Sequence, residues 1–228
     1  MISLKFVTFL ILIVAGCNSS NTQSKKKIIF FGDSITELAV KPEGFITILQ
    51  QKLQQENKSN KYELIGAGVS SNKVYDLYLR LDEDVLARKP DAVVIWIGVN
   101  DVWHKRLMGT GTDADKFEKF YQAILNKLKQ NNIAIYLCTP AVIGEKTDYT
   151  NEQDGEMNLY SNIVRTIAER NNCTLIDLRK AFLDYGKKHN GENKSKGILT
   201  YDGVHLNDNG NQFVAAELYR VLSGSFFK

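Results

Sequence analysis

The sequence predicts one α/β domain over residues 28–228, with a parallel sheet of five strands that helices cover on both faces. Two observations support this prediction. Short apolar runs, which are typical of strands buried on both faces, alternate along the chain with segments in which apolar residues recur every three or four positions. No internal repeat or linker interrupts this alternation, and about 200 residues are enough to form a substantial core.

Each predicted strand is an apolar run that ends close to a turn-forming residue. A glycine follows each of the first three runs, at Gly32, Gly66 and Gly98, and Pro140 lies just beyond the fourth. The third run, Ala-Val-Val-Ile-Trp-Ile, is the strongest strand pattern in the chain. The predicted strands are residues 28–31, 62–65, 92–97, 133–138 and 173–176.

The predicted helices lie between these strands and after the last of them. They are residues 45–55, 74–87, 117–128, 157–168, 178–185 and 212–222. Residues 102–113 and 189–201 lack helical spacing, and we expect loops there. The first would form a wall of a pocket, and residues 186–201 would act as a lid. Ligands bind at the carboxyl ends of the strands in such a sheet, so the residues that follow each strand are the candidates for a functional site.

The first residues of the chain are typical of an export signal. Lys5 precedes an apolar run over residues 6–14, which is too short to span a bilayer of about 30 Å comfortably. The run leads into Val-Ala-Gly-Cys, which resembles the lipobox of bacterial lipoproteins. This resemblance implies that residues 1–16 are a signal peptide and that Cys17 becomes the lipid-modified first residue of an exported lipoprotein at the cell envelope. An ordinary signal peptide and a buried apolar strand are the alternatives.

Residues 17–27 are predicted to be a tether between this lipid anchor and the domain, because they are polar and end in three lysines. The lipid at Cys17 would hold the protein to a membrane. Cys138 and Cys173 then remain, and they would lie at opposite ends of two parallel strands. We therefore expect no disulfide between them and interpret both as small core residues.

The charge of the chain is close to balanced, with 29 basic and 26 acidic residues and a net charge of +3. No large basic field arises, so nucleic acid is not an expected partner. The sequence contains neither a metal-binding motif nor a glycine-rich nucleotide-binding motif, and no metal or cofactor is expected. Nothing in the sequence indicates an oligomeric state.

Small and polar residues follow the first three predicted strands. Ser34 falls where the chain turns from strand to helix, where a hydroxyl can be exposed and backbone N–H groups can stabilise an anion. The small residues at 66–72 would let the backbone approach a ligand closely, and the amide of Asn100 could donate to a developing oxyanion. Taken alone, each feature is explained at least as well by a helix cap or a turn, including Asp33 or Ser34 as a cap.

An aspartate and a histidine three residues apart precede the last predicted helix, at Asp202 and His205. At this spacing the carboxylate can orient the imidazole and stabilise its protonated form. Asp101 and His104 have the same spacing, so spacing alone does not choose between the pairs. Together with the serine and the donors, either pair completes the groups that nucleophilic acyl transfer requires.

Four blocks, in this order and spacing, resemble those of the SGNH/GDSL hydrolase superfamily: Gly32-Asp33-Ser34, the turn at 66–72, Gly98-Val99-Asn100-Asp101 and Asp202-Gly203-Val204-His205. The resemblance covers residues 28–222. It implies a flavodoxin-like three-layer α/β/α sandwich with strand order 2-1-3-4-5. It also implies esterase or lipase chemistry that needs no cofactor.

The resemblance also assigns roles to residues of this sequence. It implies that Ser34 is the nucleophile, that His205, rather than His104, is the general base, and that Asp202 is the partner of His205. Ser34 N–H, a backbone N–H of the 66–72 turn and the side chain of Asn100 would form the oxyanion hole.

One position departs from the family pattern, because Ser71 stands where the family has a glycine that donates its N–H. Serine can supply that N–H without strain if its φ is negative. A positive φ would strain it by about 1 kcal/mol or more. Otherwise Gly68 would serve in a shifted register.

The expected function is that of a serine esterase that hydrolyses carboxylic esters with short acyl groups, above all acetyl, on a small molecule or a carbohydrate. Asp33, Gly68 and Trp103 are the candidate substrate-binding residues. Trp103 could stack on a sugar, cover an acyl chain or simply pack. A lysophospholipase or thioesterase of the same fold, and a surface-binding lipoprotein without catalysis, are the alternatives.

Overall fold

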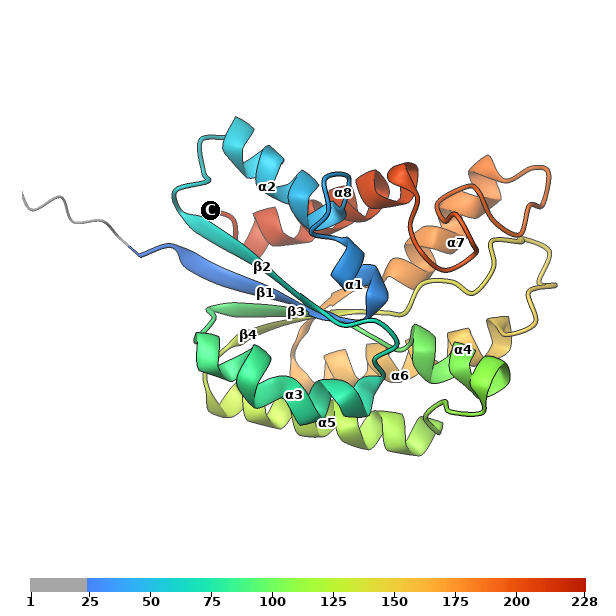
Figure 1. The fold of residues 1–228 in the computed structure, drawn as a ribbon, viewed down its shortest axis with the longest axis horizontal. Coiled ribbons are helices and arrows are strands. Elements are labelled where there is room, and N and C mark those ends of the chain that lie inside the picture. The colour runs from blue at the N-terminus through green and yellow to red at the C-terminus, as the bar shows by residue number, and fades with distance from the viewer. Residues whose placement is uncertain (1–23) are drawn as a thin grey trace, which may run out of the picture.

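The computed structural model describes residues 24–228. The predicted signal peptide, the lipidation site Cys17 and the first part of the predicted tether lie outside the described residues. The strands are β1 (Lys26–Gly32), β2 (Tyr62–Gly68), β3 (Ala92–Trp96), β4 (Ala134–Cys138) and β5 (Thr174–Ile176). They form one parallel sheet in the order β2-β1-β3-β4-β5, as the family resemblance implies (Figure 1).

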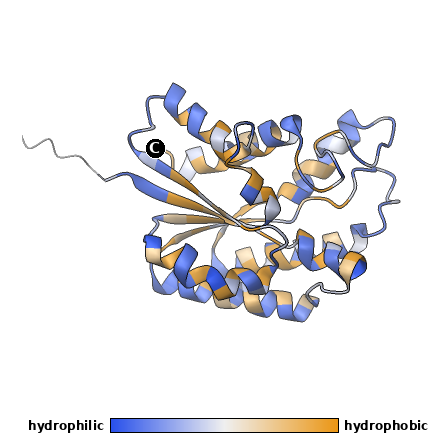
Figure 2. Cartoon of the chain, viewed as in Figure 1, coloured by the Kyte–Doolittle hydropathy of each residue, from blue (hydrophilic) through white to orange (hydrophobic). Residues whose placement is uncertain are grey.

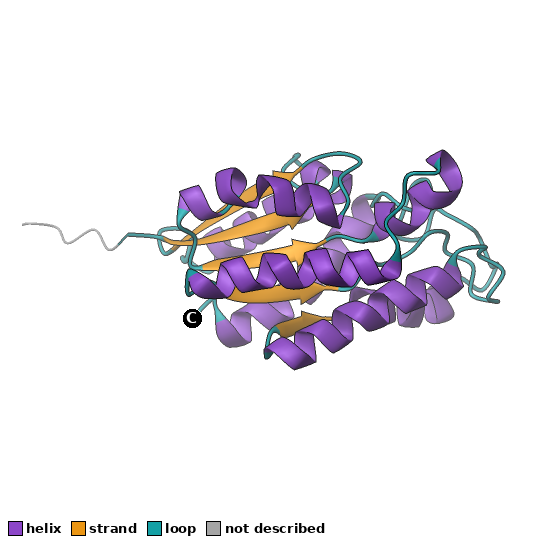
Figure 3. Ribbon diagram, turned by 90° about the horizontal axis from the view of Figure 1, so that it is seen from below, coloured by secondary structure: helices purple, strands orange, loops and turns teal. Residues whose placement is uncertain are grey.

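The sheet is the middle layer of three, as a view from below shows (Figure 3). On one face lie α1 (Ser34–Leu38), α2 (Phe45–Gln55), α7 (Leu178–His189) and α8 (Asp208–Ser225). On the other lie α3 (Val74–Asp84), α5 (Ala114–Gln130) and α6 (Asp154–Asn171). The short helices α4 (Val99–Met108) and η1 (Leu86–Arg88) complete the chain.

Strand β1 shows why the predicted strands are apolar throughout. Successive side chains of a strand point to opposite faces of the sheet. Ile28 and Phe30 accordingly pack with the α2 and α8 layer, whereas Ile29 and Phe31 pack with the α3 and α5 layer. The sheet is therefore hydrophobic on both faces and the covering helices are hydrophobic on one (Figure 2).

Two of the expected loop boundaries were wrong. Residues 102–113 were expected to be a loop, but α4 covers Val99–Met108. Its helical spacing is hidden because Asn100, Asp101 and His104 are among its buried residues, so the buried face is partly polar. At the other boundary, α7 continues to His189 instead of ending at 185.

The loop that follows α7 is held at its middle by Glu145. The carboxylate of Glu145 accepts backbone N–H groups from Ile198, Leu199 and Thr200 at 2.8, 2.6 and 2.9 Å. Three charge-assisted hydrogen bonds to consecutive residues fix the loop, which argues against the mobile lid expected at 186–201.

Cys138 is buried and Cys173 is half-buried, and both thiols are free, as predicted. Within residues 24–228, no helix is both long and apolar enough to cross a membrane. The same residues contain no group of three or more metal-ligating side chains arranged to hold an ion.

Candidate active site

The structure brings Ser34, His205 and Asp202 into one hydrogen-bonded chain. The Oγ of Ser34 lies 2.9 Å from Nε2 of His205, and Nδ1 of the same ring lies 2.7 Å from Oδ2 of Asp202. These distances are typical of a nucleophile, a general base and a carboxylate that orients the base. The chain of contacts therefore has the geometry that deprotonation of a serine hydroxyl requires.

Ser34 reaches this position because the preceding residue caps the helix. Asp33 is the N-cap of α1, and its carboxylate accepts the N–H of Ile35 at 3.0 Å. Asp33 is only 1% exposed, and burial raises its pKa to about 7 against the lowering effect of that hydrogen bond. Because the cap is Asp33, the hydroxyl of Ser34 is free to face His205. Asp33 lies in the interior, so we do not retain it as a substrate contact.

The segment that carries Asp202 and His205 is a turn with a required glycine. Gly203 has a φ of +101°, a conformation that side-chain-bearing residues rarely adopt, and its N–H donates to Oγ1 of Thr200 at 3.1 Å. Oδ1 of Asp202 accepts the N–H groups of Val204 and His205 at 2.9 and 2.7 Å. These hydrogen bonds within the turn orient the carboxylate of Asp202 towards the ring of His205.

Asp202 is the ionised partner in this arrangement. Partial burial raises its pKa, but the hydrogen bonds from the ring and backbone of His205 and from the N–H of Val204 outweigh burial, so the pKa lies below its ordinary value. A carboxylate that stays charged stabilises the imidazolium that forms when His205 takes a proton.

The second Asp/His pair does not form a comparable contact. Both oxygens of Asp101 lie within 3.3 Å of the N–H of Val74, and burial raises its pKa to about 6. His104 is 4% exposed, and its Nδ1 has no hydrogen-bond partner in the described part of the chain. Only His205 of the two candidates contacts Ser34.

The residues predicted for the oxyanion hole lie on three neighbouring segments. Ser34 begins α1, Asn100 lies in the first turn of α4, and Ser71 lies in the turn after β2. The Nδ2 of Asn100 donates one hydrogen to the carbonyl of Asn72 at 3.1 Å, which leaves its second hydrogen for a ligand.

Ser71 adopts the strained alternative, with a φ of +65°. A serine in this left-handed conformation costs about 1 kcal/mol or more. Gly68 has a different role. A Cβ on Gly68 would lie 2.0 Å from the backbone nitrogen of Glu37, so glycine is needed there for β2 to pack against α1. This close packing, and not a ligand, accounts for Gly68.

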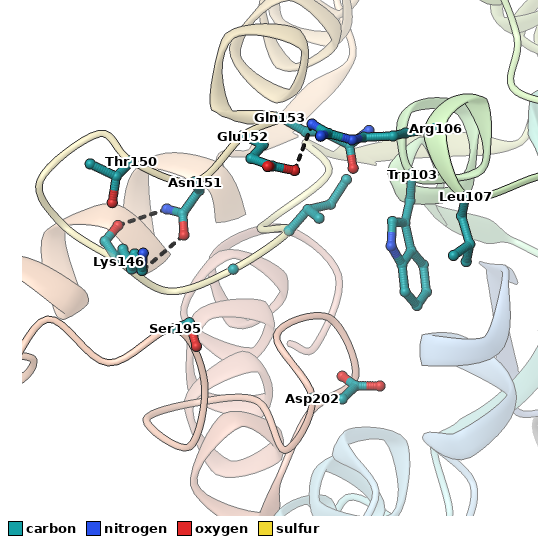
Figure 4. A pocket seen from close by; sticks show the side chains of 12 residues that line it. Trp103, Arg106, Leu107, Lys146, Thr150, Asn151, Glu152, Gln153, Ser195 and Asp202 are labelled. Atoms are coloured by element: carbon teal, nitrogen blue, oxygen red, sulfur yellow. Dashed lines mark hydrogen bonds and ion pairs between the residues drawn. The ribbon is translucent and has the colours of Figure 1, made fainter.

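A hollow of about 570 Å³ includes Asp202, but neither Ser34 nor His205, among its lining residues (Figure 4). Trp103, Arg106 and Leu107 of α4 form one side, and Asp202 lies on its rim. The ring centroid of Trp103 lies 6.2 Å from that of His205. The remaining lining residues are Ile143, Gly144, Lys146, Thr150, Asn151, Glu152, Gln153 and Ser195.

Two contributors to this region were not predicted from the sequence. The segment 143–153 follows β4 and lines the hollow, yet it has neither strand nor helix spacing. Its position after a strand was the available signal. Tyr201 stacks on His205 with centroids 5.7 Å apart and an interplanar angle of 14°. Its place next to Asp202 was the only hint.

Comparison with known protein sequences identifies related esterases. The model of the GDSL-like Lipase/Acylhydrolase family matches residues 30–213. An acetylxylan esterase from Geobacillus stearothermophilus is 30% identical over 215 residues, which cover 86% of this chain and 94% of that protein. An uncharacterized lipoprotein of Bacillus subtilis (strain 168), YqeF, is 23% identical over an alignment 234 residues long, which covers 91% of this chain and 93% of that protein.

Solved structures give the same result. The crystal structure of the acetyl xylan esterase AlAXEase is 60% identical, with a TM-score of 0.85, and the match covers 86% of this chain and 99% of that chain. A variant of Axe2, an acetyl xylan esterase from Geobacillus stearothermophilus, is 28% identical with a TM-score of 0.77, covering 90% of this chain and 96% of its own. Two further Axe2 structures are of catalytic mutants, in which a serine and a histidine are replaced.

Proposed function

We propose a substrate and a mechanism for this chain, which belongs to the GDSL-like lipase/acylhydrolase family and is a carboxylic ester hydrolase. The proposed substrate is an acetyl ester on a xylan-type carbohydrate. The observation that carries the proposal is the hydrogen-bonded chain from Ser34 through His205 to Asp202 at the rim of an open hollow. Similarity to two acetylxylan esterases, at 60% and 30% identity, supports the choice of substrate.

In the proposed mechanism, Ser34 attacks the acetyl carbonyl while Nε2 of His205 takes the serine proton. The C–O bond to the sugar then breaks, the sugar hydroxyl leaves with the proton from His205, and the acetyl group remains on Ser34. Water loses a proton to His205 and attacks this acyl-enzyme, which releases acetate and restores the serine hydroxyl. Asp202 holds the ring in place and balances its charge through both steps.

The negative charge on the carbonyl oxygen rises in both tetrahedral intermediates. The N–H groups of Ser34 and Ser71 and the free amide hydrogen of Asn100 are the proposed donors to that oxygen. Each donor of this kind contributes about 3 kcal/mol to the lowering of the barrier. The catalytic effect is therefore sensitive to where these three groups sit relative to Ser34.

The lining of the hollow supports a carbohydrate over a lipid. Lys146 and Ser195 offer polar groups, and Trp103 offers an aromatic face. Sugar rings bind to such mixtures of hydrogen-bonding groups and one aromatic surface, whereas a long acyl chain requires a mainly apolar groove. This lining favours a sugar hydroxyl as the leaving group and a short acyl group.

The proposal is tested by measuring acetate release from acetylated xylan, with Ser34→Ala as the matched control. We expect release by the parent protein and a loss of at least about 10³-fold in the variant. A series of p-nitrophenyl esters from acetate to palmitate, together with a lysophospholipid, tests the alternative substrate classes. Preference for long chains or for the lysophospholipid would replace the proposal, and a parent protein inactive on every substrate would favour a binding role.

We further propose that the protein is a lipoprotein anchored through Cys17. The lipobox-like sequence before Cys17 and the similarity to the lipoprotein YqeF support this proposal. The test expresses the full chain in a bacterium and compares it with Cys17→Ser by detergent phase partitioning and mass spectrometry. We expect a diacylglyceryl-modified Cys17 and detergent partitioning in the parent alone. An unmodified Cys17 on an exported protein would contradict the proposal.

A further inference from the structure

We propose that Arg80 is a positioning residue that sets the geometry of the oxyanion hole, an inference that rests on the proposed function. Arg80 lies on α3, outside the four blocks that carry the family resemblance. Its guanidinium connects the two segments that bear the backbone donors, the end of β1 before Ser34 and the turn that contains Ser71.

The contacts of Arg80 define this connection. Its Nη2 donates to the carbonyl of Gly32 at 2.8 Å and to that of Ala67 at 3.0 Å. Its Nε donates to Oδ1 of Asn72 at 2.7 Å. Gly32 lies two residues before Ser34, and Asn72 directly follows Ser71. One rigid group therefore fixes the distance between the two donor segments.

The chemistry of the guanidinium suits this role. It is planar and donates in fixed directions, so it holds several acceptors in one relative arrangement that a lysine ammonium cannot reproduce. The group lies over the ring of Phe31, 4.4 Å from its centroid, and Nη1 pairs with Asp84 at 2.5 Å. The ring lies against the plane of the guanidinium, and the carboxylate balances its charge.

The turn after β2 needs such support because Ser71 is strained. A residue with a φ of +65° keeps this conformation only where its surroundings over-determine it. Asn72 is held on its side chain by Arg80 and on its carbonyl by Asn100. Val74 is held by Asp101. Removal of Arg80 releases the Asn72 side chain, and the N–H of Ser71 is then free to leave the oxyanion position.

A displaced donor raises the free energy of the transition state, in which the oxygen is charged, and has much less effect on the binding of the neutral substrate. We therefore expect kcat to fall and KM to change little in Arg80→Ala. Removal of one oxyanion donor costs about 10²–10³-fold in kcat, and a displaced donor should cost about 10–100-fold. A residue that serves stability alone would lower the melting temperature without this separation of kcat from KM.

The experiment measures kcat and KM on p-nitrophenyl acetate, and the thermal midpoint, for the parent, Arg80→Ala, Arg80→Lys and Asp84→Asn. Asp84→Asn is the matched control, because it removes the ion pair of Arg80 but leaves the contacts with Gly32, Ala67 and Asn72. We expect a fall in kcat of about 10–100-fold in Arg80→Ala and of at least about fivefold in Arg80→Lys, with KM within about threefold. Asp84→Asn should keep kcat within about twofold at a lower midpoint.

The inference is overturned if Arg80→Ala keeps kcat within about twofold of the parent, or if Asp84→Asn loses as much activity as Arg80→Ala. Should Arg80→Ala fail to fold, Arg80→Lys decides, because it retains the charge beside Asp84; an unchanged kcat there is equally contradictory. A parent without esterase activity would overturn the proposed function and this inference with it. An active parent whose Arg80 variants keep the kcat of the parent would overturn the role of Arg80 alone.

Discussion

The hydroxyl of Ser34 lies 2.9 Å from Nε2 of His205 although 171 positions separate the two residues in the chain. Ser34 stands just beyond the carboxyl end of β1, an inner strand of the sheet, and His205 stands just before α8. The start of α8 is tied to the start of α2, since Oδ1 of Asn211 accepts the N–H of Phe45 at 3.1 Å. The packing of these two helices on one face of the sheet thus places His205 within hydrogen-bond distance of Ser34.

Replacement of His205 and His104, one at a time, tests which of the two Asp/His pairs supplies the general base. His205→Ala should lower kcat on p-nitrophenyl acetate by at least about 10³-fold, because the base that deprotonates Ser34 is lost. His104→Ala removes a buried ring and should mainly lower the thermal midpoint, with kcat within about tenfold of the parent. A greater loss of activity in His104→Ala than in His205→Ala would contradict the assignment of the base.

Ser71→Gly should stabilise the protein without loss of activity. Glycine adopts a φ of +65° freely and still supplies the backbone N–H, so relief of strain should raise the free energy of unfolding by about 0.5–1 kcal/mol. We expect kcat within about twofold of the parent, because the donor itself is unchanged. Ser71→Ala is the control: it removes the hydroxyl but keeps the strain, and should not gain stability. Urea unfolding gives both values, and a less stable Ser71→Gly would show that the serine is not strained.

The buried carboxyl of Asp33 should make stability depend on pH. Burial raises its pKa from an ordinary 3.8 to about 7 in the folded protein. A group with a raised folded pKa stabilises most below its unfolded pKa, and this contribution is lost as the pH rises through about 7. Asp33→Asn cannot ionise but keeps an oxygen that can accept the N–H of Ile35.

We therefore expect Asp33→Asn to exceed the parent in unfolding free energy at pH 8 by about 1 kcal/mol or more, and the difference to shrink towards pH 5. Asp115→Asn is the matched control, because the exposed carboxyl of Asp115 has its pKa lowered by the hydrogen bond from Lys119, so this change should not stabilise at pH 8. Parallel curves for the parent and Asp33→Asn between pH 5 and 8 would contradict the raised pKa.

Trp103→Ala tests whether the ring of Trp103 stacks on a bound sugar. Stacking on Trp103 should contribute about 1–1.5 kcal/mol to the binding free energy, so its loss should raise KM for an acetylated xylo-oligosaccharide about 5–10-fold. The same variant should change KM for p-nitrophenyl acetate by less than about threefold, because the small ester reaches only Ser34 and its neighbours. Leu107→Ala, on the same helix and in the same hollow, is the control without a stacking ring. Equal effects of the two variants on the oligosaccharide would argue against stacking by Trp103.

The sequence predicts much of this fold because strand and helix periodicities are strong in the layers that cover the sheet. Apolar spacing failed at α4, where the buried face includes Asn100 and Asp101, so a functional helix looked like a loop. The pairing of His205 with Ser34 depends on contacts across 171 positions, and only the resemblance to a family distinguished it from the local pair Asp101 and His104. The sequence did not identify Arg80, because two of its partners are backbone carbonyls of other segments, at Gly32 and Ala67, and a backbone carbonyl carries no residue-specific pattern.

Covalent labelling with a fluorophosphonate, which reacts with an activated serine nucleophile, tests the role of Ser34 directly. We expect one label per molecule, located on Ser34 by mass spectrometry of the digested protein. We also expect no labelling of Ser34→Ala and strongly slowed labelling of His205→Ala at the same concentration. A label on a different serine, or acetate release by a protein that cannot be labelled, would contradict the assignment of Ser34 as the nucleophile.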